Sequence, residues 1–123
     1  MRLGGAAIGA HLYAVHVLVN AISDASARGL YDATTSRMLL AEQDALLRTL
    51  SVVAAELAEQ TGLPAADKRF VAKANGAAGA VLELISAARR IVQEPTSDKA
   101  REDFAELRAS SLAKVRGVLG TPR

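Results

Sequence analysis

The stretch FVAKANGAAGAVLELISAARRI, residues 70–91, decides the fold class of this chain. Its apolar residues recur at alternating spacings of four and three, which is the pattern of one face of an α-helix. A second apolar set widens that face. The stretch predicts a long core helix from about Ala65 to Gln93, ended by Pro95. The main face is Phe70, Ala74, Ala77, Val81, Leu84, Ala88 and Ile91, and the second set is Val71, Ala78, Leu82, Ile85 and Val92.

Two segments before this stretch show the same spacing. The first covers about residues 6 to 28, and the second runs from about Tyr31 to Gln60. Gly62 and Pro64 mark the end of the second, because glycine favours the left-handed residue after a helix and proline cannot continue one. In the first, the predicted face is Ile8, Leu12, Val15, Val19 and Ile22, with a second seam of Ala7, Ala14, Leu18, Ala21 and Ala25. Such a wide apolar surface suits a central helix of a bundle. In the second, the predicted face is Leu39, Leu46, Leu50, Val53 and Leu57, widened by Leu40 and Leu47.

A fourth helix is predicted from about Asp98 to Val118, with Ser97 or Thr96 as its N-cap. Its apolar set is thinner than that of the third helix, and Ser111 falls on the same face. The set is Phe104, Leu107, Leu112, Val115, Val118 and Leu119.

Length and composition agree with one helical domain. The chain has 123 residues, half of them hydrophobic but only 3% aromatic, so small and aliphatic side chains must fill its core. No segment alternates apolar and polar residues as a strand would. Long helices joined by short turns favour antiparallel neighbours. We therefore predict a single all-α domain over residues 1–123, folded as an antiparallel up-and-down four-helix bundle.

Gly76 and Gly79 lie inside the third predicted helix, although glycine there costs about 1 kcal/mol relative to alanine. They share a face with Ala72, Glu83, Ser86 and Arg90 that is smooth in its first half. A smooth strip lets another backbone approach closely. It predicts either a close crossing within the chain or a groove for a partner's helix.

The residues that could carry catalysis or a metal do not converge. There is no cysteine, and His11 and His16 are five residues apart, so they point in different directions from a helix. The GGAAIG stretch at residues 4–9 is followed by no lysine–serine pair and preceded by no predicted strand. We expect no enzymatic activity, no catalytic residue, no metal and no cofactor. An exposed His16 would instead suit a histidine phosphotransfer bundle.

Charge gives little indication of a partner. The net charge is +2, and the basic residues after Glu106, which are Arg108, Lys114, Arg116 and Arg123, have no interleaved aromatics. We therefore expect no nucleic acid partner. The run from Leu3 to Ser23 is uncharged, but His11, His16 and Asn20 interrupt it, so we expect no membrane partner. Core, interface and targeting signal all stay open for this first segment.

Two stretches carry a resemblance to a known family. ARGLYDATTSRMLLAEQDALLRTL has a glycine–leucine step before a long helix with the run Glu42 to Leu47, and KANGAAGAVLELISAARRIVQ has Asn75 ahead of a leucine-rich part. These stretches, within residues 27–93, resemble the FlgN-type flagellar export chaperones. The resemblance implies a cytoplasmic, helical, non-enzymatic protein that holds flagellar or secreted subunits. It places the client surface on the fourth helix, at Phe104, Leu107, Leu112 and Val115.

The expected function is thus the binding of a protein client or partner helix, most concretely as an export chaperone. Gly76 and Gly79 belong to the expected partner-binding surface together with the four residues of the last helix. The alternatives are a signalling bundle, either phosphotransfer-like or a sensor, and an oligomeric structural module that pairs through its first helix.

Overall fold

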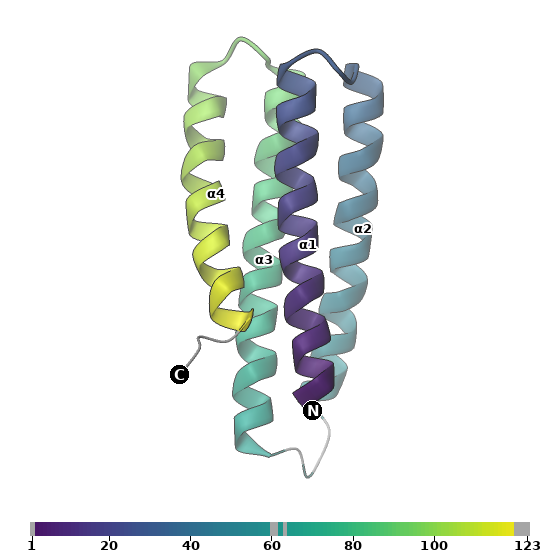
Figure 1. Cartoon of the computed structure of the whole chain (residues 1–123), viewed down its shortest axis with the longest axis vertical. Helices are drawn as coiled ribbons and strands as arrows, with labels where there is room; N and C mark the ends of the chain where they lie inside the picture. The colour runs from purple at the N-terminus through teal and green to yellow at the C-terminus, as the bar shows by residue number, and fades with distance from the viewer. Residues whose placement is uncertain (1, 60–61, 63, 120–123) are drawn as a thin grey trace.

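Four helices and no strand make up the part of the chain that the computed structural model describes, which is residues 2–59, 62 and 64–119 (Figure 1). They are α1 (Arg2–Ala27), α2 (Ala33–Ala58), α3 (Ala65–Gln93) and α4 (Asp98–Leu119). They run alternately up and down, so the predicted all-α class and four-helix arrangement are confirmed. The bounds of α3 are those predicted from the sequence.

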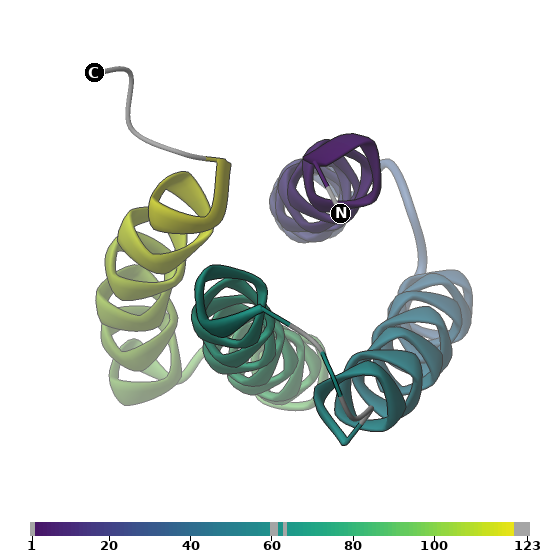
Figure 2. The ribbon, with the colours of Figure 1, turned by 90° about the horizontal axis from the view of Figure 1, so that it is seen from below.

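The third helix is the centre of the bundle. Among the described residues it contacts each of the other helices, whereas α2 and α4 do not contact one another. Seen end-on, α2, α3 and α4 form a curved layer, and α1 lies in its trough (Figure 2). This position explains the wide apolar face of residues 70–91, since a central helix must bury more than one of its sides.

The core follows the predicted faces of α1, α3 and α4. Leu84 and Val81 of α3 are fully buried, as are Leu12 and Val19 of α1. Phe70 and Ile91, at the two ends of the α3 face, are partly buried and pack against this core. The other core residues of these three helices are Val15, Ile22, Ala74, Ala77, Ala78, Ile85, Ala88, Phe104, Val115 and Val118.

Local hydrogen bonds define the helix ends. After α1, Gly29 has a φ of 75°, and the amide of Leu30 donates to the carbonyl of Ala25, which together end the helix with a left-handed glycine. The Asp32 carboxylate caps α2 by accepting from the Thr35 amide at 2.7 Å. The Ser97 hydroxyl accepts from the Ala100 amide at 3.1 Å, so Ser97 is the N-cap of α4. Gly62 has a φ of 84°, as predicted.

The predicted face of α2 is confirmed in part: Leu39 and Leu50 are partly buried and pack against the core, whereas Leu46 and Val53 were wrongly assigned to it. Leu46 and Val53 are 49% and 48% exposed, while Leu40 and Leu47 are fully buried. The buried seam is completed by small residues, Ser36 and Ala54. Because α2 carries apolar residues on two adjacent sides, the spacing alone favoured the side with more leucines. The side chain of Leu57 lies outside the described part.

The second seam predicted for α1 is also wrong. Ala14, Leu18 and Ala21 are exposed, and Ala25 is partly buried. The reason is the position of α1 in the trough, where one side of the helix meets all three neighbours and the opposite side faces outward. The side chain of Ala7 lies outside the described residues.

One helix in the described part, α3, is long and apolar enough by length and composition to cross a membrane. In its most apolar window 44% of the residues are buried inside the bundle. The core helix of a soluble protein has the same character.

Two leucine substitutions test this arrangement. Leu84→Ala removes a fully buried side chain and is expected to lower the free energy of unfolding by about 2 to 5 kcal/mol. Leu46→Ala removes a half-exposed side chain and is expected to cost about 1 kcal/mol. Urea denaturation of both variants measures the difference. Equal losses would contradict the facing of α2.

Candidate functional site

A buried polar contact joins the first and last helices. Nδ1 of His16 lies 3.0 Å from Oγ of Ser111, and Nε2 lies 3.1 Å from Nδ2 of Asn20. His16 is only 2% exposed and Ser111 is fully buried. With the Asn20 amide donating to Nε2, the ring carries its proton on Nδ1 and donates it to Ser111. Asn20 therefore donates to His16, and His16 in turn donates to Ser111 of α4.

His16 is held in its neutral form. Burial lowers the pKa of its imidazole, and the positive charges of Arg108 and Arg116 lower it further. All three causes oppose protonation, so the ring stays uncharged at neutral pH. A neutral ring also suits its hydrogen bonds, since it needs one donor and one acceptor nitrogen.

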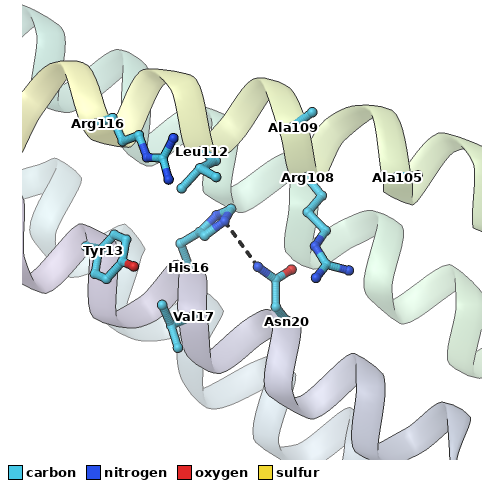
Figure 3. Close-up of a pocket in the computed structure, with 9 residues that line it drawn as sticks. All are labelled: Tyr13, His16, Val17, Asn20, Ala105, Arg108, Ala109, Leu112 and Arg116. Atoms are coloured by element: carbon cyan, nitrogen blue, oxygen red, sulfur yellow. Dashed lines mark hydrogen bonds between the residues drawn. The ribbon is translucent and has the colours of Figure 1, made fainter.

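A pocket of about 350 Å³ opens beside this contact, between α1 and α4. Figure 3 shows Arg108 and Arg116 reaching from α4 on either side of His16, with Tyr13 and Asn20 on α1. The lining contains no acidic residue. It consists of Tyr13, His16, Val17, Asn20, Ala105, Arg108, Ala109, Leu112 and Arg116.

The glycines of α3 do not support a close crossing within the chain. Gly76 is exposed and Gly79 is partly buried, and a Cβ added to either would meet no atom within 4 Å. The in-chain explanation is wrong because no other part of the described chain approaches these two glycines closely. A contact with a partner's helix stays a prediction.

Gly76 does line a groove of about 300 Å³ between α3 and α4. Its other walls are Lys73 and Ala77 of α3, and Lys114 and Gly117 of α4. Because Gly76, Ala77 and Gly117 have little or no side chain, the contact between α3 and α4 stays open at this end.

The residues predicted to bind a client on α4 are part of the bundle. Phe104 and Val115 are buried in the core, at 6% and 0% exposure. Leu107 and Leu112 are partly buried. These four residues form the inner side of α4, and their prediction as a client surface stays untested.

A second groove of about 300 Å³ follows the first half of α4, where Arg90 of α3 meets Asp103. Arg90 donates to the Asp103 carboxylate at 3.0 Å, and Lys99 donates to its other oxygen at 2.9 Å. The hydrogen bond from Lys99 is the main cause that lowers the pKa of Asp103 below its usual range. Arg90 thus links α3 to α4 through Asp103. The position of Arg90 near the end of a helix did not indicate this contact.

Sequence reasoning missed the pocket between α1 and α4. His16 and Asn20 were noted as polar interruptions of the first segment, and Ser111 was placed on the apolar face of the fourth helix. Nothing local pairs His16 with Ser111, because they are 95 positions apart. Arg108 and Arg116 were noted only as part of a basic end; Arg123 lies outside the described residues. Among the described residues no three histidine, aspartate or glutamate side chains gather as a metal site would require.

Comparison with protein-family models, with curated proteins and with solved structures finds no match to this chain.

The neutral His16 has a consequence for stability. Because its pKa is lower in the folded chain than in the unfolded chain, the unfolded chain binds the proton more readily at mildly acidic pH. The free energy of unfolding is therefore expected to fall as the pH drops below about 6.5, the unperturbed histidine pKa. His16→Gln is expected to remove this part of the pH dependence, while His11→Gln retains it. Urea titrations of the three proteins between neutral and mildly acidic pH measure the difference. An unchanged slope in His16→Gln would contradict the assignment.

Proposed function

We propose that this chain is a non-enzymatic protein-binding bundle that accepts an amphipathic helix of a partner protein in the place of α4. The observation that supports it is the set of three grooves, of about 300 to 350 Å³, in which α4 forms one wall. One lies towards α1 and two lie towards α3. A helix bordered by grooves on both sides loses less packing when it leaves than one that is tightly enclosed.

The contacts of α4 favour its opening. Its buried residues are Ala100, Phe104, Ser111, Val115 and Val118, and two of these five are alanine or serine, which bury little apolar surface. The central helix α3 buries nine residues. Packing supplies most of the stability of a helix in a protein, so we expect α4, whose buried stripe is thinner than that of α3, to open more readily than α3.

Opening would create a helix-binding groove. The sides of α1 and α3 that α4 covers become accessible, and a partner helix with apolar residues at helical spacing fits them. The same movement frees Phe104, Leu107, Leu112 and Val115 of α4 as anchors. Gly76, beside the vacated place, and Gly79, one turn further along α3, leave room for the partner's backbone to approach.

The narrower form of this proposal is an export chaperone in the cytoplasm that holds flagellar or secreted subunits. It rests on the resemblance of residues 27–93 to the FlgN-type family. A phosphotransfer function fits less well, because His16 is buried and both of its ring nitrogens face protein partners.

A disulfide across α1 and α4 tests the opening. A Cβ on Gly9 lies 3.4 Å from Cα of Leu119, which is close enough for a disulfide between Gly9→Cys and Leu119→Cys. The chain has no other cysteine to compete. The probe is a labelled synthetic peptide of residues 98–119. The reduced double variant is expected to bind the peptide, and the oxidised form is expected to lose that binding.

Hydrogen exchange provides a second measurement on the unmodified chain. Amides of α4 are expected to exchange faster than those of residues 70–91 in α3. Equal exchange in the two helices, or equal peptide binding by the oxidised and reduced forms, would rule out binding by displacement of α4. Proteins captured from cell extract by the reduced but not by the oxidised form are then the candidate clients.

The outward face of α1 supports a second candidate function, an oligomeric structural module. Tyr13, Val17 and Leu18 are exposed, and the neighbouring Ala14 and Ala21 are exposed as well. No charged residue of α1 lies between Tyr13 and Ala21, so α1 itself would bring no charge into a contact between these faces in two copies.

Sedimentation equilibrium of the full chain tests this second candidate. A dimer is expected, and Val17→Glu is expected to separate it by placing a charge in the contact. Met38→Glu, which changes an exposed residue of α2, is the matched control. A monomer at all concentrations, or equal effects of both variants, would contradict pairing through α1.

A further inference from the structure

The pocket between α1 and α4 is lined by two arginines whose charges are not neutralised, Arg108 and Arg116, and by the neutral side chain of His16. In the described part of the chain, Arg108 and Arg116 form no ion pair, and the pocket contains no acid. In the printed sequence, Glu106 is the last acidic residue. We propose that this pocket binds a small organic dianion, with one acidic group at Arg108 and the other at Arg116.

The spacing of the arginines favours an elongated ligand. Eight residues separate them, which is about 12 Å along a helix axis. Figure 3 shows their guanidinium groups on opposite sides of His16, with Leu112 of α4 between the two positions. A monoanion would contact one arginine and leave the other unneutralised. A molecule with a carboxylate at each end can form charge-assisted hydrogen bonds with both.

The size of the pocket also suits a small molecule. Its volume of about 350 Å³ falls at the lower end of the range that ligand pockets occupy. Tyr13 and Val17 on α1 and Leu112 on α4 provide apolar surface for the carbon chain of the ligand.

Asn20 indicates a polar group in the middle of the ligand. Its Nδ2 is used by His16, whereas its Oδ1 is buried and has no hydrogen-bond partner. A buried acceptor without a donor is costly. Because the Asn20 side chain also lines the pocket, a small shift of it on ligand binding would let a hydroxyl group of the ligand donate to Oδ1. The ligand class is therefore a hydroxylated dicarboxylate.

The neutral His16 fits this ligand class. The charged groups that face its ring are Arg108 and Arg116 of α4, and its polar neighbours are Ser111 of α4 and Asn20 of α1. A bound dianion would offset the two arginines. The pKa of His16 is then expected to rise when the ligand binds, which gives a readout at the site itself.

Calorimetric titration of the full chain is the direct test, with malate, succinate, acetate and inorganic phosphate as probes at one ionic strength. Malate is expected to bind one per chain, more tightly than succinate, with acetate weakest. Arg108→Gln and Arg116→Gln are each expected to weaken malate binding at least about tenfold, since a hydrogen bond between charged groups contributes that much. Both side chains are exposed, so these variants keep the fold.

Lys114→Gln is the matched control. It removes the same charge from the same helix, but Lys114 lines the groove towards α3. It is expected to change malate binding less than about twofold, because exposed charges outside the site are largely screened. NMR titration of His16 with and without malate measures the expected rise of its pKa.

Several results would overturn the proposal. Equal weakening by Lys114→Gln would show general attraction of anions. Acetate or phosphate binding as tightly as malate would show a simple anion site on one arginine. No heat with any probe at about 10 mM would show that the pocket binds none of them. In the oxidised Gly9→Cys/Leu119→Cys protein, α4 stays against α1, and this form is expected to bind malate. A negative result for malate binding can therefore be told apart from a negative result for displacement of α4.

Discussion

The bundle depends on the burial of α3 against three neighbours at once. Its apolar surface is too wide for one partner helix, and hydrophobic surface that stays in water carries a free-energy cost of about 25 cal/mol per Å². α2 and α4 cover its two flanks, and α1 covers the remaining side from the trough between them. Small residues at Ala74, Ala77 and Ala78 let those helices approach closely. This one requirement sets the place of every other helix.

The same arrangement places a buried polar contact between α1 and α4, where His16 meets Ser111. A buried polar pair contributes less than apolar packing unless all of its hydrogen bonds are satisfied, and Oδ1 of Asn20 is not. The pocket beside the pair and the two arginines at its edge follow from this imperfect contact.

The two proposals on α4 concern its contact with α1 in two states, one closed and one open. In the closed state this region offers a small polar pocket with positive charge, and in the open state it offers an apolar groove. A ligand that binds the closed state shifts the equilibrium away from the open one, because it adds binding free energy to one state only. A small molecule at Arg108 and Arg116 would thus oppose a partner helix at the inner side of α4, with no contact between the two.

Much of the fold could be predicted from the sequence, for local reasons. The four-three spacing of residues 70–91 and the end at Pro95 specify α3, since periodicity and helix ends depend on residues within a few turns. The Ser97 cap of α4 was predicted for the same reason. Where two sides of a helix were comparably apolar, the spacing could not choose between them. Thus Leu46 was predicted to be buried and is exposed, and Leu18 was assigned to an inner seam and faces outward.

The sequence by itself determined the helices and their order, whereas the central place of α3 came from the structure. The tertiary structure alone decided which side of α1 and α2 meets the core, that His16 meets Ser111 across 95 positions, and that Arg108 and Arg116 flank one pocket. The physical reason is that a helix's own residues set its periodicity. The azimuth at which it packs depends on the shape of the trough formed by the other helices.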